Sequence, residues 1–235
     1  GCGTTQCPHC PDDIKLFIKM EPHKPDKILA KRYRLISSLS LVDQMVDRVL
    51  FGVWQAYEID HVMQRAGKTG WSPMPVGFQD MLEYFPHGVL ATDCSAFDWT
   101  YPAWLPHLIV DIKLSQMQDY SPEYAIAVRA RVDEVLGPRC TLRLPNGDRL
   151  RQTVYGVMKS GWLLTISLNS DAQELATLLA HYRAYGVVAP KLWSMGDDVI
   201  MRWPDDRDPA PLVEQLRRAG LLTKFATPDK EFAGF

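Results

Sequence analysis

The stretch KLWSMGDDVIMRW (residues 191–203) places two adjacent carboxylates, Asp197 and Asp198, between two apolar runs. Apolar runs on both sides of a glycine-containing turn predict a hairpin of two strands. Neighbouring carboxylates in such a turn repel one another and are costly to desolvate. Most Gly-Asp-Asp sequences are ordinary solvated turns. The alternative is a bound divalent cation, because Mg²⁺ prefers carboxylates and phosphates as ligands.

A second acidic stretch lies about a hundred residues earlier, in TDCSAFDW (residues 92–99). It places Asp93 at the end of a predicted strand (residues 89–92) and Asp98 five residues further on. Asp93 can lie beside the Gly-Asp-Asp hairpin if the two strands are neighbours. Acids from two strands can hold the two metals of in-line phosphoryl transfer, where one activates the attacking hydroxyl and the other stabilises the leaving pyrophosphate.

Charge and composition narrow the class of protein. The chain has 235 residues, enough for one large domain or two small ones, and no apolar run long enough for a membrane span. The net charge of −2 argues against a generally basic nucleic-acid binder, yet residues 15–34 hold seven Lys or Arg and only two acids. Such a local basic stripe favours a phosphate-handling channel, with a solvated loop as the alternative.

The N-terminal residues 1–14 show no periodicity and are predicted to be irregular. The five cysteines are an odd number, which favours a reducing compartment. Cys2, Cys7, His9 and Cys10 offer one C-x2-C pair without a convincing second pair. A zinc site needs four well-spaced ligands, so a loose terminus is preferred to a zinc site.

Periodicity along the chain predicts alternating helices and strands. Strands are expected at residues 14–20, 32–38 and 221–227, and a hairpin at 141–154 around Asn146-Gly147. A helix from a Ser40 cap to about residue 65 has a wide apolar face, which is expected to be buried. Further helices are expected at residues 121–137, 160–186 and 208–220. The predicted fold class is α+β, with helices packed on an antiparallel sheet.

Five stretches of the chain resemble the ordered motifs of a known family. ATDCSAFDW (residues 91–99), KSGWLLTISLNS (159–170) and WSMGDDVIM (193–201) resemble motifs A, B and C of viral RNA-directed RNA polymerases. IKMEPHKPDKILAKRYRLISSLSLVDQ (18–44) resembles motif F, and AGLLTKFATPDKEFAGF (219–235) is similar to motif D running into motif E. The resemblance covers about residues 15 to 235 and is closest to the sobemovirus–polerovirus-like group of positive-strand RNA viruses.

The resemblance implies roles for the acidic residues and for motif B. Asp93 and Asp197 would ligate two Mg²⁺ or Mn²⁺ ions, with Asp198 as a weaker or indirect ligand. Asp98 would hydrogen-bond the ribose of the incoming nucleotide. Carboxylate and amide groups can together recognise a 2′-hydroxyl, which both donates and accepts hydrogen bonds. Motif B would complete this network and supply a flexible loop, through Asn169, Thr165, Ser160 and Gly161.

The resemblance also implies roles for basic residues. The nucleotide channel would be lined by Lys19, Lys27, Arg32 and Arg34. Among these, Arg34 would be the best triphosphate ligand, because a planar guanidinium suits phosphate oxygens. Lys230, within TPDK, matches the motif D lysine proposed to protonate the departing pyrophosphate, and is preferred to Lys224.

The implied architecture is a right-hand polymerase palm with part of the fingers. Residues 15–88 would be partial fingers with motif F, 89–120 palm with motif A, and 121–158 a fingers insertion with a hairpin. Residues 159–235 would be palm with motifs B, C, D and the start of E. Polymerases of this family are usually longer, and a thumb is absent here, so the chain would be a fragment or a reduced enzyme.

The implied function is RNA-templated RNA synthesis in viral genome replication, by transfer of rNTPs to an RNA 3′-hydroxyl. Partners would be the RNA template, the nascent RNA and other viral replication proteins, in replication complexes of the host cytoplasm. One alternative is a reverse transcriptase, although Asp98 with Asn169 suits ribose. Another is a non-catalytic RNA-binding palm fragment.

Overall fold

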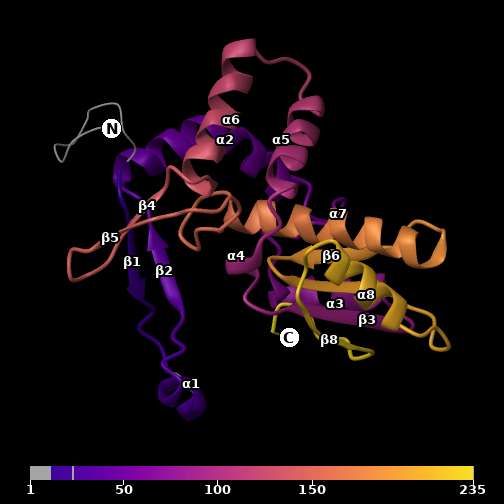
Figure 1. Cartoon of the computed structure of the whole chain (residues 1–235). Helices are drawn as coiled ribbons and strands as arrows, with labels where there is room; N and C mark the ends of the chain where they lie inside the picture. Colours follow the sequence, from indigo (N-terminus) through magenta and orange to yellow (C-terminus); the bar gives the residue numbers. More distant parts are fainter. Residues whose placement is uncertain (1–11, 23, 235) are drawn as a thin grey trace.

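Two four-stranded sheets organise the chain (Figure 1). The computed structural model describes residues 12–22 and 24–234, so the Cys2, Cys7, His9 and Cys10 group lies outside the described residues. One sheet has the strand order β2-β1-β4-β5 and the other β6-β7-β3-β8. Helices pack against both, which confirms the α+β fold class.

The second sheet is antiparallel throughout and contains the predicted hairpin. Its strands are β6 (Leu192–Met195), β7 (Asp198–Arg202), β3 (Val89–Cys94) and β8 (Thr223–Thr227). β3 lies between β7 and β8, with Thr92 opposite Val199 on one side and opposite Ala226 on the other. The strand that ends near Asp93 is therefore a direct neighbour of the Gly-Asp-Asp hairpin, which was the condition for bringing Asp93 to the turn.

Both faces of this sheet are covered, which explains why its strands are almost continuously apolar. Val199 and Met201 of β7 belong to the main core, into which α7 (Thr165–Tyr185) and α8 (Ala210–Arg218) also pack. Ile200, between them, points into a separate aromatic cluster. That cluster lies beside η1 (Pro73–Gly77) and α3 (Phe78–Tyr84), and its members are Trp71, Met81, Phe85, Val89, Trp193, Ile200 and Phe232.

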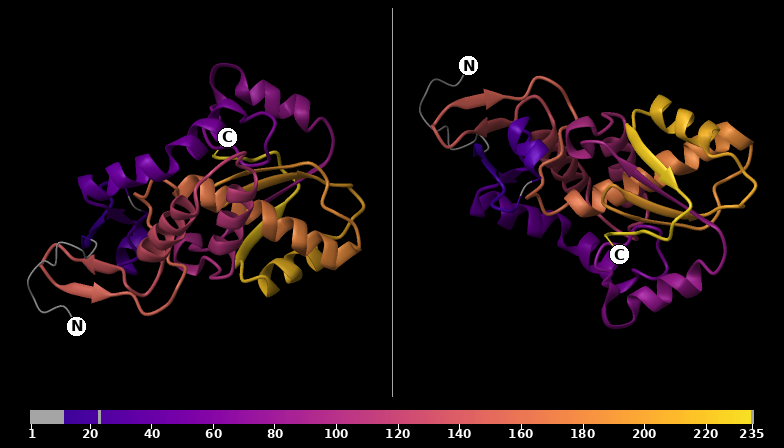
Figure 2. Two further views of the ribbon diagram at one scale, coloured as in Figure 1. Left: turned by 90° about the horizontal axis from the view of Figure 1, so that it is seen from above. Right: turned by 90° about the horizontal axis from the view of Figure 1, so that it is seen from below.

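The first sheet carries a ribbon that projects from the body of the molecule (Figures 1 and 2). β1 (Ile14–Ile18) and β2 (Leu35–Ser38) are antiparallel, and α1 (Pro25–Leu29) lies at the far tip of the ribbon. β1 also pairs in parallel with β4 (Thr141–Arg143), which forms the predicted hairpin with β5 (Arg149–Arg151). The basic residues of the predicted channel therefore lie on one extended arm.

Helices α2 (Leu41–Asp60) and α5 (Leu105–Ser115) both pack against α6 (Pro122–Leu136), above the second sheet in the view of Figure 1. Two predicted caps are confirmed, because Ser40 Oγ accepts a hydrogen bond from the backbone N–H of Asp43 and Ser121 Oγ accepts one from Tyr124. The short helix α4 (Phe97–Thr100) follows β3. The sequence patterns did not indicate α1, α3, α4 or α5, and α7 begins at Thr165, later than predicted.

Helix α2 differs from its prediction in length. It ends at Asp60 instead of near residue 65. The residues that follow leave the helix because Ala66 and Lys68 form backbone hydrogen bonds with Ser194, at the edge of β6. Sheet pairing thus replaces the last predicted turn of the helix.

The buried face of α2 is also not the predicted one. Its buried stripe includes two carboxylates, Asp47 and Glu58, together with Phe51 and Trp54. Arg131 of α6 pairs with Asp47, and Lys113 of α5 pairs with Glu58. Buried cations need such partners, so the acidic stripe faces inward. The apolar residues expected in the core are exposed instead, and they are Leu41, Val42, Met45, Val46, Val49 and Val53.

A membrane span was not expected from the sequence. Across residues 12–22 and 24–234, no helix combines the length and the apolar run that crossing a lipid bilayer requires.

Candidate active site

Three carboxylates converge at one end of the second sheet. Asp93 lies near the end of β3, where the pairing with β8 shifts register, and Asp198 is the first residue of β7. Asp197 lies in the tight turn between β6 and β7. One oxygen from each carboxylate can be chosen so that all three lie within 4.8 Å of one another. Gly196 makes this turn possible, because its φ of 65° is in the left-handed region.

Partial burial makes this cluster electrostatically demanding. Loss of water around Asp197 raises the pKa of its carboxyl group, and the charges of Asp93 and Asp98 raise it further. Desolvation, together with repulsion from Asp197 and Asp93, raises the pKa of Asp198 to about 6. Such a group of oxygen donors suits a hard divalent cation such as Mg²⁺ or Mn²⁺, which would offset the repulsion. The residues present therefore fit the predicted metal centre.

A lysine contacts the cluster from β8. Lys224 Nζ lies 2.8 Å from Oδ2 of Asp93, and this ion pair raises the pKa of the lysine. Lys230, which the sequence favoured over Lys224, is exposed in the segment that follows β8. Of the two candidate lysines, Lys224 is thus the one that the fold brings to the carboxylates.

The predicted pair for ribose recognition is assembled from two helices. Asn169 of α7 donates from Nδ2 to Oδ1 of Asp98 in α4, over 3.1 Å. Burial raises the pKa of Asp98, while this hydrogen bond and the charge of Arg34 oppose the rise. The Oδ1 atom of Asn169 is buried and has no hydrogen-bond partner among the described residues. Thr165, predicted to join this network, donates instead to the carbonyl of Lys159.

The predicted channel residues are spread along the projecting arm. Lys19 and Arg34, where the paired part of the ribbon ends on the side of α1, both pair with Glu21, with N–O distances of 2.7 and 3.2 Å. The charge of Arg34 also lowers the pKa of Asp197, so its guanidinium acts on the carboxylate cluster. Lys27 on α1 and Arg32 in the following loop are exposed farther out on the arm.

The start of motif B is joined to this arm. Ser160 Oγ accepts a hydrogen bond from the backbone N–H of Ser37 in β2, over 3.0 Å. A β-carbon added to Gly161 would lie 2.2 Å from the carbonyl oxygen of Ser37. Only glycine fits this contact, so the predicted loop residues Ser160 and Gly161 pack directly on the base of the ribbon.

Two residues behind the turn were not predicted from the sequence. Ser170 and Gln173 of α7 are both buried and hydrogen-bonded to the backbone of Gly196 and Asp197. The available signal was the unusual number of polar residues on a helix that is buried along much of its length. That pattern indicates buried hydrogen bonds, but it does not identify their partners.

Comparison with known proteins places the chain among viral replication proteins. A family model described as viral RNA-directed RNA polymerase matches residues 8–73 and 140–228. The chain is 34% identical over 202 residues to the replicase polyprotein P2AB of Cocksfoot mottle virus, covering 83% of this chain and 20% of the polyprotein. It is 33% identical over 210 residues to the protein P1-P2 of Pea enation mosaic virus-1, covering 80% of this chain and 17% of that protein.

The chain also resembles a protein named RNA-directed RNA polymerase from Mushroom bacilliform virus. The two are 32% identical over 233 residues, which covers 95% of this chain and 54% of the relative. The chain therefore spans about half of this relative and about a fifth of the polyproteins.

Mn²⁺ is expected to raise the melting temperature of the chain near neutral pH, on the order of 3 °C for each kcal/mol of repulsion relieved. The Asp198 carboxyl has a pKa of about 6 in the folded chain, above its ordinary 3.8. Its contribution to stability is therefore greatest below about pH 4 and is lost as the pH rises through about 6. Protons compete with Mn²⁺ for the same oxygens, so the Mn²⁺ effect should shrink as the pH falls toward 5.

Asp198→Asn tests whether Mn²⁺ binds at the three carboxylates, with Asp206→Asn in an exposed turn as the matched control. Without metal at neutral pH, the Asp198 variant should melt at a higher temperature than the wild type, because repulsion is relieved. It should also show a smaller Mn²⁺ effect, because less repulsion remains for the ion to relieve. An equal Mn²⁺ effect in the wild type and the Asp198 variant would place the metal elsewhere.

Proposed function

We propose, since the chain belongs to the viral RNA-directed RNA polymerases, that it carries out RNA-templated RNA synthesis in viral genome replication. In this reaction the 3′-hydroxyl of an RNA strand attacks an incoming rNTP, and pyrophosphate leaves. The observation that carries the proposal is the convergence of Asp93, Asp197 and Asp198 at one end of the second sheet. This is the arrangement that metal-assisted phosphoryl transfer requires.

The three carboxylates would hold two divalent ions, Mg²⁺ or Mn²⁺. When bound, these ions would supply Lewis acidity toward phosphate oxygens and the attacking hydroxyl. Asp93 and Asp197 are proposed as the direct ligands, with Asp198 as the weaker one. By neutralising the cluster, the ions would also let the half-buried carboxylates stay ionised at the pH of the reaction.

Sugar selection would use the Asp98–Asn169 pair. Asn169 Nδ2 already donates to Asp98, while its buried Oδ1 has no partner among the described residues. A ribose hydroxyl can donate to that oxygen and accept from another group, whereas a deoxyribose leaves it unsatisfied at a cost of about 1–3 kcal/mol. The buried, unpaired acceptor supports selection of rNTPs and speaks against the reverse transcriptase alternative.

The basic arm would receive the triphosphate. Arg34 is proposed as the principal phosphate ligand, because its charge already acts on Asp98 and Asp197. Lys19 shares its carboxylate partner Glu21 and lies beside it. Lys27 and Arg32, farther along the arm, would guide the nucleotide or the template by charge alone.

Proton transfer to the leaving pyrophosphate is proposed for Lys224. The sequence favoured Lys230, and that assignment stays a prediction, but the contact between Lys224 and Asp93 supports the other lysine. A general acid must lie within hydrogen-bonding reach of the atom that it protonates. A lysine beside the metal ligands meets this requirement, whereas Lys230 lies in the exposed segment beyond β8.

We further propose that the second sheet with α7 and α8 is the palm, and that the β1–β2 ribbon belongs to the fingers. Template and nascent RNA would be the partners, with other viral replication proteins, in replication complexes of the host cytoplasm. The family assignment supports these proposals, together with the order of the motifs along the sheet.

Primer extension on an RNA template tests the function. The chain should extend an RNA primer with rNTPs in Mg²⁺ or Mn²⁺, and Asp197→Ala should reduce extension to background because it removes a metal ligand. Extension with dNTPs alone would indicate a reverse transcriptase. RNA binding without extension, unaltered by Asp197→Ala, would indicate a non-catalytic palm.

Asp98→Ala is expected to weaken the preference for rNTPs over dNTPs by about tenfold, the value of one charged hydrogen bond. The measurement is kcat/KM for paired rNTP and dNTP substrates. Asp111→Ala, at an exposed acid of α5, is the control and should leave selectivity unchanged. Unchanged selectivity in Asp98→Ala would contradict its role in sugar recognition.

Lys224→Met should lower kcat with little change in the KM for rNTPs, because the proton is needed after the nucleotide has bound. Lys230→Met is the matched control, six residues further along the same motif, and should change kcat much less. The reverse ranking of the two variants would restore the sequence-based choice of Lys230.

A further inference from the structure

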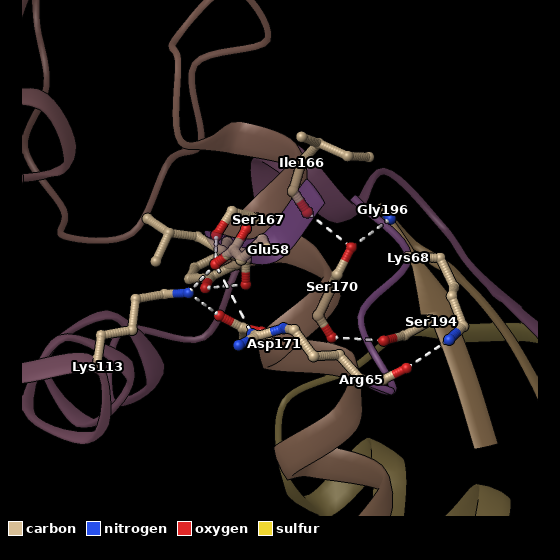
Figure 3. A network of polar contacts seen from close by, with 12 residues as sticks. Glu58, Arg65, Lys68, Lys113, Ile166, Ser167, Ser170, Asp171, Ser194 and Gly196 are labelled. Atoms are coloured by element: carbon tan, nitrogen blue, oxygen red, sulfur yellow. Dashed lines mark hydrogen bonds and ion pairs between the residues drawn. The ribbon is translucent and has the colours of Figure 1, made fainter. Parts of the chain in front are cut away.

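The Gly-Asp-Asp turn is held from behind by a serine of α7 (Figure 3). Ser170 Oγ accepts a hydrogen bond from the backbone N–H of Gly196 over 3.1 Å. The same hydroxyl donates its proton to the carbonyl of Ile166, over 2.7 Å. A hydroxyl has one proton, so its bond to Ile166 turns a lone pair toward Gly196. Because Ser170 is fully buried, no water can replace either bond.

Two neighbouring bonds extend this contact along the chain. Gln173, one turn further along α7, donates from Nε2 to the carbonyl of Asp197 over 3.0 Å. Ser194 donates its hydroxyl proton to the carbonyl of Ser170 over 2.9 Å. The backbone of the turn is thus fixed to α7 at Gly196 and Asp197, and the strand before it at Ser194.

The position of α7 along its own axis is fixed by buried ion pairs. Asp171, next to Ser170, pairs with Lys113 Nζ at 2.5 Å and with a guanidinium nitrogen of Arg65 at 3.2 Å. Glu58 of α2 also pairs with Lys113, and it accepts a hydrogen bond from Ser167. Figure 3 shows these ion pairs, here called the ionic layer, and the contact of Ser170 with the turn on neighbouring faces of α7. The helix therefore cannot slide relative to α2 and α5 without breaking buried ion pairs.

We propose that Ser170 and Gln173 are positioning residues, which set the backbone of the turn so that the carboxylates of Asp197 and Asp198 face Asp93. Three like charges at one site tend to move apart, and the backbone of a tight turn is the part most free to move. With its N–H and C=O groups bonded to α7, the turn leaves only side-chain rotation for relief. This inference rests on the proposed metal centre and adds a second layer of residues to it.

If Ser170 and Gln173 only stabilised the fold, their replacement would lower stability without a specific effect on metal binding. Another buried serine of α7 serves as the matched control. Ser167 and Ser170 are both buried serines of α7, less than one turn apart. Ser167 bonds to the ionic layer through Glu58, whereas Ser170 bonds to the turn. Ser167→Ala should therefore cost stability without displacing the carboxylates.

The experiment measures Mn²⁺ affinity by electron paramagnetic resonance, together with the free energy of unfolding in urea, for Ser170→Ala, Gln173→Met and Ser167→Ala. Loss of one hydrogen bond to the turn should weaken Mn²⁺ binding about fivefold in the first two variants. Ser167→Ala should bind Mn²⁺ within about twofold of the wild type, despite a similar loss of stability. Gln173→Met keeps the volume of the side chain, so it tests the proposal even if Ser170→Ala does not fold.

The outcomes separate this inference from the function on which it rests. Wild-type affinity in Ser170→Ala or Gln173→Met, or equal weakening in Ser167→Ala, would overturn the positioning role. If the wild type binds no Mn²⁺, or if Asp197→Asn binds it as well as the wild type does, the metal centre itself is wrong.

Discussion

Three carboxylates that meet in a half-buried corner repel one another, and much of the surrounding structure bears on that repulsion. The central position of β3 brings Asp93 to the hairpin, and the left-handed Gly196 lets the hairpin turn tightly enough to meet it. Burial on both faces of the sheet removes water and strengthens the repulsion. Lys224 and Arg34 supply positive charge from two sides, one from the edge strand and one from the projecting arm.

The stability of the fold and the chemistry of the site make opposite demands here. A carboxylate whose pKa rises on folding costs stability at neutral pH, so the sheet would be more stable without Asp198. The chain keeps it and fixes the turn with buried hydrogen bonds from α7. Strained or repulsive groups persist where the surrounding structure over-determines them, and active sites are where they cluster.

The sequence predicted the parts of the fold whose signals are local. The Gly-Asp-Asp hairpin, the Asn146-Gly147 turn and the serine caps depend on residues close together in the chain, and all were found. The buried face of α2 was wrong because its partners are distant. Valines are normally buried, but Arg131 and Lys113 lie far along the chain, and their need for carboxylate partners decides which face turns inward.

In the candidate site, too, the features with a local sequence signal were predicted and those that depend on distant contacts were not. Asp98 and Asn169 could be paired in advance because each belongs to a recognisable motif, and the structure brings them into contact. Ser170 ends the stretch that resembles motif B but was given no role there, and Gln173 lies beyond it, so neither was expected to contact the turn. Lys224 lies on β8 and Lys230 lies beyond it. Which of the two reaches Asp93 depends on how β8 pairs with β3, and the spacing of residues in the sequence does not determine that pairing.

The contact between Gly161 and Ser37 has a mechanical consequence. The base of the charged ribbon and the loop that opens α7 touch without room for a single methyl group, and Ser160 adds a hydrogen bond at the same place. At this point the two segments cannot move independently. Any displacement of the ribbon, such as the proposed binding of a triphosphate would bring, is passed on to the helix that bears Asn169 and backs the acidic turn. The contact thus couples the arm proposed to receive the triphosphate to the helix that carries one half of the proposed sugar-selecting pair.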